Sequence, residues 1–385
     1  MKLRIFILPA ILLLLAFYTH LNLGRISPDN DRTNWLITLS VFALMVGSQI
    51  VYRLNWWPSK WLISRALVWA GSVCMGLWAT FILLSMIADL LYCFVMIFQV
   101  LMPGKFVLAD ERSLLHQIFL AIAGLSVLIA LLGLWQAVTG PKIKKIAIAV
   151  KDLPKALQGL KIAQISDLHI GATIHRDYVA SIVSKTMRLE ADIIAITGDM
   201  ADGTPEELRP YLPPFANLKA RHGVYFITGN HEYYSGVKEW LAEWRSFGFI
   251  PLINENRIIS HNNTKVMVAG VTDLTAYQFL PEHRSDPAKA IASSEEVAFK
   301  LLLAHQPESC FEAEKAGFDL QLSGHTHAGQ FFPFTILVKL AKRYYRGLQR
   351  HGRMWLYINP GTGYWGAANR FLVPSEITLI RLEAS

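Results

Sequence analysis

Long apolar runs fill the first 140 of the 385 residues and limit what this part of the chain can fold into. A run of about 20 apolar residues is long enough to cross a bilayer as a helix. We therefore predict an all-α membrane domain over residues 1–140 with four transmembrane helices, at about residues 5–23, 35–53, 66–88 and 113–138. The first run could also be a signal peptide, but no small-residue cleavage site follows it, so we interpret it as a retained anchor.

The third apolar run, residues 66–102, is longer than one crossing needs. As a single helix it would extend about 55 Å, against a hydrocarbon core of about 30 Å. No Pro or Gly pair marks a hairpin near its middle, so we expect one crossing at 66–88, followed by a segment that projects from the bilayer or lies on it. Asp89 then falls at the helix exit, where a hydrated carboxylate is the simpler interpretation and a functional intramembrane acid is the alternative.

The basic residues around these helices predict the orientation of the chain. With four crossings, nine Lys and Arg residues flank one side of the membrane and four flank the other. The nine are Lys2, Arg4, Arg53, Lys60, Arg65, Lys142, Lys144, Lys145 and Lys151, and the four are Arg25, Arg32, Lys105 and Arg112. Because the cytoplasmic side is usually richer in Lys and Arg, we predict a multi-pass protein of the cell inner (plasma) membrane with a cytoplasmic C-terminal domain. That domain moves to the other face if residues 66–102 cross twice.

Residues 141–385 repeat the strand, polar turn and helix pattern of an α/β domain. Strand runs such as Ile193–Ile196 are continuously apolar, which is typical of a sheet covered on both faces. Several strands end in Asp, Asn or His, and an open α/β sheet places its ligand site at the carboxyl ends of its strands. The sequence therefore predicts a functional site where these strand ends meet.

The stretch Ser323–Gln330 is the strongest candidate for part of that site, because His325 and His327 follow an apolar strand two residues apart. Alternation along a strand directs both rings to one side, and imidazole is the commonest metal ligand in proteins. Taken alone, the stretch could equally be a loop with two surface histidines.

Four other strand ends add carboxylate, amide and imidazole groups to this pair, and none of the five contains Cys, which structural zinc sites prefer. Such oxygen and nitrogen ligands suit Mn²⁺, Fe or Zn²⁺. The candidate metal ligands are Asp167, His169, Asp199, Asn230, His305, His325 and His327. Seven ligands are too many for one ion, so we predict two divalent metal ions (Mn, Zn or Fe) that share a carboxylate, with Asp199 as the expected bridge. Paired ions of this kind hold a phosphoryl oxygen and lower the pKa of a water molecule.

These residues resemble the five-block pattern of the calcineurin-like metallophosphoesterases. The blocks are Asp167-Leu168-His169, Gly198-Asp199, Gly229-Asn230-His231, His305 and Gly324-His325-Thr326-His327, in the family's order over about residues 161–328. The resemblance implies a four-layer α/β/β/α sandwich over residues 141–385 and hydrolysis of a phosphoester or pyrophosphate bond. It implies one ion held by Asp167, His169, Asp199 and His327, and another held by Asp199, Asn230, His305 and His325. His231 would then stabilise the transition state or protonate the leaving oxygen, so the expected catalytic residues are His231 and Asp199.

Other polar residues permit two interpretations each. Asp202 is either a support for the metal ligands or a turn residue, and Asp273 and Arg370 are either substrate contacts or turn and surface residues. Residues 331–347 join apolar side chains to a basic and aromatic cluster, which indicates an interfacial helix or loop, or else a helix packed on the domain.

The membrane part and the Ser-Gly-His-Thr-His-x-Gly-Gln stretch resemble a bacterial branch of the family that includes enzymes similar to UDP-2,3-diacylglucosamine pyrophosphatases. We expect a phosphoesterase with a phosphate-containing small molecule or lipid as substrate, such as a lipid-linked nucleotide. The alternatives are a tethered phosphodiesterase for soluble nucleotides and a non-catalytic metal-binding membrane scaffold. The net charge of +8 comes largely from loops beside apolar segments and from residues 339–353, so we expect a membrane rather than nucleic acid as partner. The three cysteines form no disulfide framework, which is typical of a reducing compartment.

Overall fold

The computed structural model describes residues 2–53, 62–102, 110–293 and 295–385. These residues form two compact units. The first contains the helices up to Trp135 together with Gly366–Phe371, and the second contains Gln136–Trp365 and Leu372–Ser385. Lys60 and Lys105, which enter the count of basic residues, lie outside the described residues.

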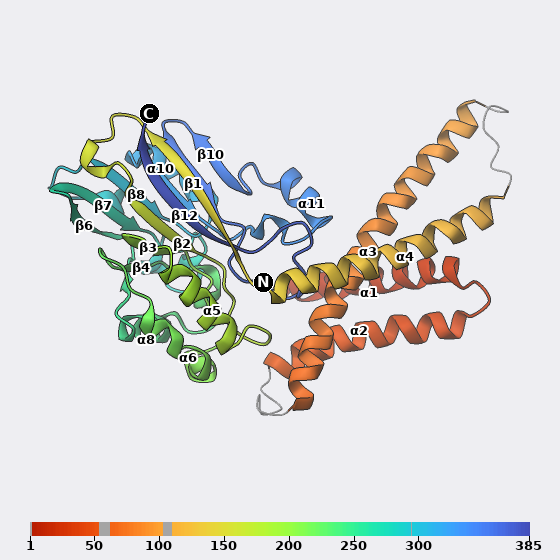
Figure 1. Ribbon diagram of the computed structural model, residues 1–385. Coiled ribbons are helices and arrows are strands. Elements are labelled where there is room, and N and C mark those ends of the chain that lie inside the picture. Colours follow the sequence, from red (N-terminus) through yellow and green to blue (C-terminus); the bar gives the residue numbers. More distant parts are fainter. Residues whose placement is uncertain (1, 54–61, 103–109, 294) are drawn as a thin grey trace. The chain divides into compact units, whose positions relative to one another are not determined.

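The first unit is built from long helices, drawn in red to yellow in Figure 1. They are α1 (Lys2–Ile26), α2 (Asp31–Arg53), α3 (Leu62–Leu101) and α4 (Glu111–Val138). Within the described ranges, Ala66–Leu101 and Glu111–Val138 are long and apolar enough to cross a membrane, and Ile11–Ile26 is a shorter apolar helix. A crossing by α1 or α2 stays a prediction.

Asp89 lies inside α3, which continues to Leu101, and its carboxylate is paired. Arg25 of α1 donates to Asp89 Oδ1 at 2.5 Å, and the Tyr18 hydroxyl donates to Asp89 Oδ2 at 2.6 Å. Asp89 thus has a cationic partner from α1, and its expected position at the exit from the bilayer stays a prediction.

The segment Gly366–Phe371 packs among α3 and α4 within the first unit. The Ser72 hydroxyl of α3 donates to the carbonyl of Gly366 at 2.5 Å and accepts from the amide of Ala368 at 2.9 Å. The amide of Arg370 donates to the carbonyl of Gly133 in α4 at 3.0 Å. The Arg370 side chain is fully buried, so its interpretation as a surface residue is wrong.

Two six-stranded sheets form the centre of the second unit. The first has the order β1 (Lys142–Val150), β12 (Glu376–Ala384), β2 (Lys161–Ile165), β3 (Ile193–Ile196), β4 (Val224–Phe226) and β5 (Ile250–Pro251). The second has the order β10 (Gly347–His351), β11 (Met354–Ile358), β9 (Leu320–Ser323), β8 (Phe299–Leu303), β7 (Thr264–Gly270) and β6 (Glu255–His261). Strands β2 to β5 run parallel, as do β11, β9, β8 and β7, so each sheet collects several carboxyl ends at one edge.

The two sheets pack face to face around one apolar core. Ile162 and Ala195 of the first sheet and Val268 and Leu301 of the second belong to this core, and all four are fully buried. Helices α9 (Pro287–Ile291) and α10 (Cys310–Ala316) pack on the outer face of the second sheet. Helices α5 (Arg176–Met187) and α8 (Val237–Ser246) lie beside the first sheet in Figure 1. This arrangement confirms the expected α/β fold with two sheets.

Strand β6 was not predicted from the sequence, although it forms a hairpin with β7. The two strands are joined by Asn262 and Asn263, whose φ angles are 48° and 63°. A two-residue turn with positive φ at both positions is the favoured hairpin connection, and Asn tolerates it well. The Asn-Asn pair was thus the available signal for this hairpin.

Candidate metal centre

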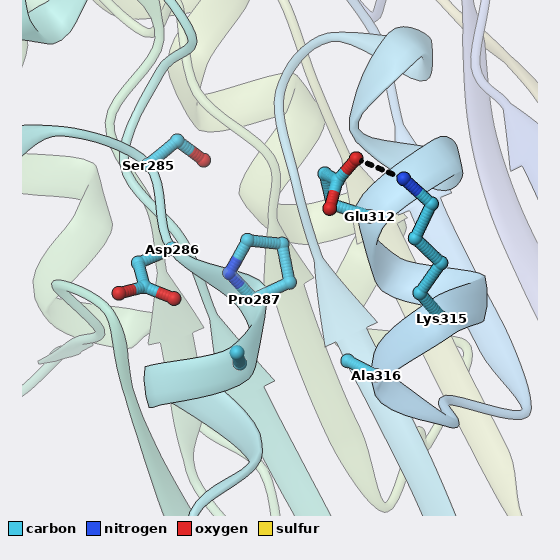
Figure 2. A pocket seen from close by; sticks show the side chains of 7 residues that line it. Ser285, Asp286, Pro287, Glu312, Lys315 and Ala316 are labelled. Atoms are coloured by element: carbon cyan, nitrogen blue, oxygen red, sulfur yellow. Dashed lines mark hydrogen bonds and ion pairs between the residues drawn. The ribbon is translucent and has the colours of Figure 1, made fainter.

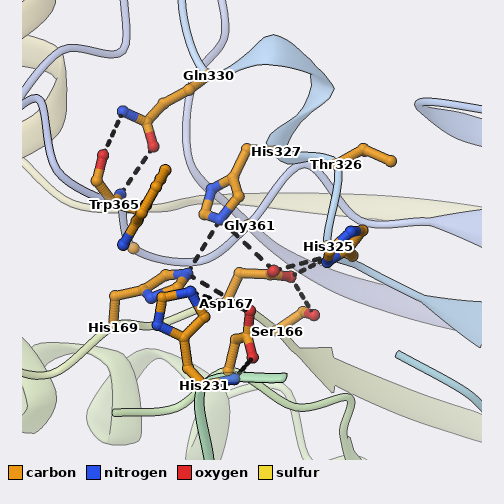
Figure 3. Close-up of polar contacts among 12 residues, drawn as sticks. Ser166, Asp167, His169, His231, His325, Thr326, His327, Gln330, Gly361 and Trp365 are labelled. Atoms are coloured by element: carbon orange, nitrogen blue, oxygen red, sulfur yellow. Dashed lines mark hydrogen bonds and ion pairs between the residues drawn. The ribbon is translucent and has the colours of Figure 1, made fainter. Parts of the chain in front are cut away.

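The predicted ligands all follow strands of the second unit and meet at the carboxyl ends of those strands. Asp167 and His169 follow β2, and Asp199 follows β3. Asn230 begins α7 (Asn230–Tyr234) after β4, and His305 follows β8. Figure 3 shows side chains from the loops after β2, β4 and β9 pointing toward one another.

One group of side chains consists of Asp167, His169 and His327. The Nε2 atoms of the two histidines lie 3.0 Å apart, and His327 Nε2 lies 3.5 Å from Asp167 Oδ1. Two nitrogens bound to one ion at about 2.0–2.1 Å lie roughly 3 Å from each other. The three side chains therefore have the spacing that a shared cation requires.

A second group consists of Asp199, His305 and His325. His305 Nε2 lies 3.1 Å from Asp199 Oδ2 and 3.2 Å from His325 Nδ1. The same Oδ2 atom is 4.0 Å from His169 Nε2 of the first group. Asp199 consequently lies between the two groups, as a bridging carboxylate must.

Asn230 supplies an independent test of whether these residues suit a cation. Its side chain is 8% exposed, and in the described part of the chain its buried Oδ1 atom receives no hydrogen bond. A buried acceptor left unpaired costs about 1–3 kcal/mol. A metal ion bound by Oδ1 would remove that cost, so the donor set fits the metal pair implied by the sequence pattern.

Two of the ligands, Asp199 and His325, have the protonation states that bind a metal. Burial disfavours ionisation of Asp199, but the charge of His305 and the hydrogen bond from it hold the pKa of Asp199 well below its usual value. Burial, together with the charge of His305, lowers the pKa of His325 to about 4. An ionised carboxylate and a neutral imidazole are the forms that bind metals. Burial disfavours the charged ring of His305, but the charges of Asp199 and Asp167 outweigh burial and raise its pKa, so a cation must displace a proton from His305.

Asp202 holds two histidine rings at once. One of its oxygens, Oδ1, lies 2.8 Å from His169 Nδ1 and 2.7 Å from His231 Nδ1. Because a carboxylate oxygen accepts, both Nδ1 atoms carry hydrogen and both Nε2 atoms face the site. Such a carboxylate fixes the orientation and tautomer of a metal-binding ring. Of the two interpretations of Asp202, the structure favours support of the ligands.

His231 stands beside the metal ligands without belonging to either group. Its Nε2 atom lies 4.0 Å from Asp199 Oδ2, and its side chain is 16% exposed. Burial disfavours the charged ring, but the hydrogen bond to Asp202 and the charge of Asp199 outweigh burial and raise the pKa of His231 to about 9. The ring is therefore positioned and protonated to donate at neutral pH in the metal-free protein.

Glu232 is a supporting residue that sequence reasoning missed. Its carboxylate is fully buried and accepts from the amides of Asp199 at 3.0 Å, Met200 at 2.8 Å and Gly229 at 2.7 Å. It thereby joins the turn after β3 to the turn after β4. Burial and the charge of Asp199 raise the pKa of Glu232 to about 7. Its position directly after His231 in the motif was the only sequence signal.

Trp365 is a second missed residue. Its side chain is 53% exposed, and its ring centroid lies 5.7 Å from that of His231 and 6.5 Å from that of His169. Gln330, at the end of the His-Thr-His stretch, donates to the Trp365 carbonyl at 3.0 Å and accepts from its amide at 2.7 Å (Figure 3). An exposed aromatic ring is thus held at the edge of the site by the residue that ends the motif.

Backbone geometry explains why small or polar residues occupy these loops. Asp167, His169 and Asp199 have φ angles of 50°, 53° and 54°, a region that few residues other than Gly, Asn, Asp and His adopt. A side chain at Gly324 would place its Cβ atom 2.0 Å from Asp167 Oδ2. Glycine at this position therefore leaves room for the carboxylate.

Of the two interpretations of Asp273, substrate contact or turn residue, the structure favours the turn residue. Its Oδ1 atom accepts from the Thr275 amide at 2.8 Å, and its Oδ2 atom accepts from Gln306 Nε2 at 2.9 Å. The side chain is almost fully buried. These bonds brace the loop that follows His305.

A separate hollow lies between α9 and α10 (Figure 2). Its charged lining includes Lys315 and Glu312, which are exposed and pair with each other at 2.6 Å. None of the candidate metal ligands lines this hollow. This hollow is therefore distinct from the convergent site described above.

Comparison with known proteins identifies the class to which this fold and site belong. Residues 160–329 match the calcineurin-like phosphoesterase family. An uncharacterized metallophosphoesterase of Helicobacter pylori is 38% identical over 256 residues, which cover 65% of this chain and 66% of the relative. A metallophosphoesterase of Campylobacter jejuni is 32% identical over 266 residues, covering 69% of each chain. The chain belongs to the calcineurin-like metallophosphoesterase family, as its sequence pattern predicted.

A relative from Danio rerio carries the name transmembrane protein with metallophosphoesterase domain. It is 37% identical over 267 residues, which cover 67% of this chain and 61% of the relative. The chain thus spans less than two thirds of the Helicobacter and Danio relatives.

Proposed function

We propose that this protein is a membrane-anchored hydrolase of phosphoester or pyrophosphate bonds that works with two divalent metal ions. The observation that carries the proposal is the meeting of two ligand groups on either side of Asp199, with the unpaired Asn230 oxygen beside them. Family membership supports the same reaction class.

The ligand sets that we propose follow the two groups. One ion would be held by Asp167, His169 and His327 together with Asp199, and the other by Asp199, His305 and His325 together with Asn230. Bound there, such ions neutralise charge on phosphoryl oxygens and make a water molecule a better nucleophile.

His231 supplies the proton that the leaving oxygen needs. Its Nδ1–H is engaged by Asp202 at 2.7 Å, so Nε2 is the atom free to face substrate. A positioned acid of this kind contributes typically about 10²–10⁴-fold to rate. Asp202 has the further role of keeping His169 and His231 in the same tautomer.

The exposed side chains of helix α11 (Phe334–Ala341) support the proposal that the substrate lies at a lipid surface. The helix begins seven residues after His327, and none of its residues is buried. Ile336, Leu337 and Leu340 are 43%, 45% and 80% exposed. An exposed apolar face next to basic residues is typical of an element that lies in a membrane interface. We propose that α11 and the exposed Trp365 ring receive the apolar part of a phosphate-containing lipid or lipid-linked nucleotide.

The count of basic residues supports a cytoplasmic location for the metal centre, at the inner face of the plasma membrane.

The decisive experiment is a hydrolysis screen of phosphate-containing lipids in vesicles and of free nucleotides, with Mn²⁺-loaded full-length protein beside His231→Ala. We expect the wild type to hydrolyse a lipid substrate. The His231→Ala variant should hydrolyse it about 10²–10⁴-fold more slowly while binding as much metal as the wild type. Turnover of soluble nucleotides alone would favour the tethered phosphodiesterase. Metal binding with no turnover of any substrate would favour the scaffold.

A change in α11 separates the lipid proposal from the reaction itself. Leu337→Ser with Leu340→Ser should reduce turnover in vesicles and leave turnover of a soluble phosphodiester unchanged. Met187→Ser, which alters an exposed apolar residue of α5, is the matched control and should change neither. Equal turnover by the α11 variant and the control in vesicles would exclude a role of α11 in lipid binding.

A further inference from the structure

A third group of metal-ligating side chains lies apart from the metal centre. It consists of Asp192, His222 and His261, whose nearest ligand atoms all lie within 4.8 Å of one another. Asp192 precedes β3 and His222 precedes β4, so both lie at the amino ends of strands whose carboxyl ends carry the metal centre. His261 is the last residue of β6 in the second sheet. The group therefore lies at the opposite end of the sandwich.

The two histidines of this group have the geometry of the histidine pairs in the metal centre. His222 Nε2 and His261 Nδ1 are 3.0 Å apart, and the ring centroids are 5.2 Å apart with an interplanar angle of 66°. The pair of His305 and His325 has ring nitrogens 3.2 Å apart, centroids 5.0 Å apart and an angle of 75°. Both spacings suit two nitrogens bound to one ion at about 2.0–2.1 Å.

Asp192 is held in place to supply an oxygen. Its Oδ2 atom accepts from the amide of Lys161 at 2.9 Å, and its main-chain carbonyl accepts from the amide of His222 at 2.8 Å. These bonds fix the carboxylate and tie it to the turn that carries His222. His261 is 6% exposed, while Asp192 and His222 are half-buried, so water can complete the coordination from the open side.

We propose that Asp192, His222 and His261 form a further cation site that takes Zn²⁺ or a similar borderline divalent ion. Two imidazoles and a carboxylate, without sulfur, are ligands that zinc accepts alongside water. Because Asp192 and His222 precede strands of the first sheet and His261 ends a strand of the second, the ion would link the two sheets. This site would stabilise the fold and is independent of the proposed hydrolytic reaction. The simpler alternative is a hydrogen bond between the two imidazoles with no bound ion.

Zinc stoichiometry tests the proposal. Full-length protein is stripped with chelator, dialysed against buffered Zn²⁺, and its bound zinc is measured by mass spectrometry. We expect one equivalent fewer in His222→Gln, His261→Gln and Asp192→Asn than in the wild type. Asp192→Asn keeps an oxygen that can accept from the Lys161 amide, so it is expected to fold. His351→Gln is the control, because His351 Nδ1 pairs with the Tyr344 hydroxyl, and it should bind as much zinc as the wild type.

A second measurement locates the ion without relying on the number of zinc ions bound per protein. Diethyl pyrocarbonate modifies accessible neutral imidazoles, and mass spectrometry of peptides reports each histidine separately. Zn²⁺ should protect His222 and His261 in the wild type and fail to protect them in Asp192→Asn. The proposal is overturned if the three variants bind as much zinc as the wild type, or if Zn²⁺ leaves the reactivity of His222 unchanged. Neither readout depends on hydrolysis, so failure here leaves the proposed phosphoesterase function intact.

Discussion

Replacing Gly133 by Ala tests how tightly the segment Gly366–Phe371 packs inside the helical unit. Gly133 lies in α4 against Asn369, and an added Cβ atom would be 1.7 Å from Asn369 Oδ1. Ordinary contact begins at 3.4 Å, so the Asn369 side chain must rotate away or its segment must shift. Forcing an extra methyl group into a packed interior costs about 1–3 kcal/mol.

The expected effect is a loss of stability in the helical unit. We expect Gly133→Ala to lower the free energy of unfolding by about 1–3 kcal/mol, which thermal or denaturant unfolding of the full-length protein in detergent measures. Metal content should stay unchanged, because none of the ligands is altered.

Gly124→Ala is the matched control for this experiment. Gly124 lies in the same helix α4, and a Cβ atom there meets nothing within 4 Å. Both substitutions add one methyl group and raise helix propensity by about 1 kcal/mol, so only the contact with Asn369 differs. Adding Asn369→Ala to Gly133→Ala removes the obstructing side chain and should recover much of the lost stability. The packing argument is refuted if Gly133→Ala and Gly124→Ala are equally stable.

Three further predictions concern the metal centre itself. Asp202→Asn should lower the pKa of His231 from about 9 toward 6.5. In the metal-free wild type, His231 contributes about 3 kcal/mol of stability that is complete below pH 6.5 and lost as pH rises to about 9. Thermal melting from pH 6 to 10 should show this loss in the wild type and a much smaller one in the variant. Gly324→Ala should displace the Asp167 carboxylate and weaken Mn²⁺ binding, which calorimetry measures; unchanged affinity would contradict the packing argument. Chelation should abolish hydrolysis and added Mn²⁺ restore it, whereas activity that survives chelation would contradict a metal requirement.

Much of the fold could be predicted because the buried strands are short apolar runs with polar ends. Met354–Ile358 was expected as a strand and is β11 over the same residues. Strand β6 was missed because Glu255–His261 mixes polar and apolar residues on an incompletely buried edge. The pattern along such an edge strand does not separate one buried face from one exposed face.

The same reasoning explains which site residues could be foreseen. His325 and His327 lie two positions apart, so alternation alone predicted that they act together. Glu232 and Trp365 act through main-chain bonds to distant loops, and Asp89 pairs with a residue 64 positions away. No local spacing encodes such contacts, because they depend on how separate elements pack.

The central claim is that two cations lie on either side of the Asp199 carboxylate. Anomalous diffraction from crystals soaked in Mn²⁺ measures this directly. The account predicts two peaks about 3.5–4 Å apart, one within bonding distance of His169 and His327 and the other within bonding distance of His305 and His325. A single peak, or peaks that do not contact Asp199, would contradict it.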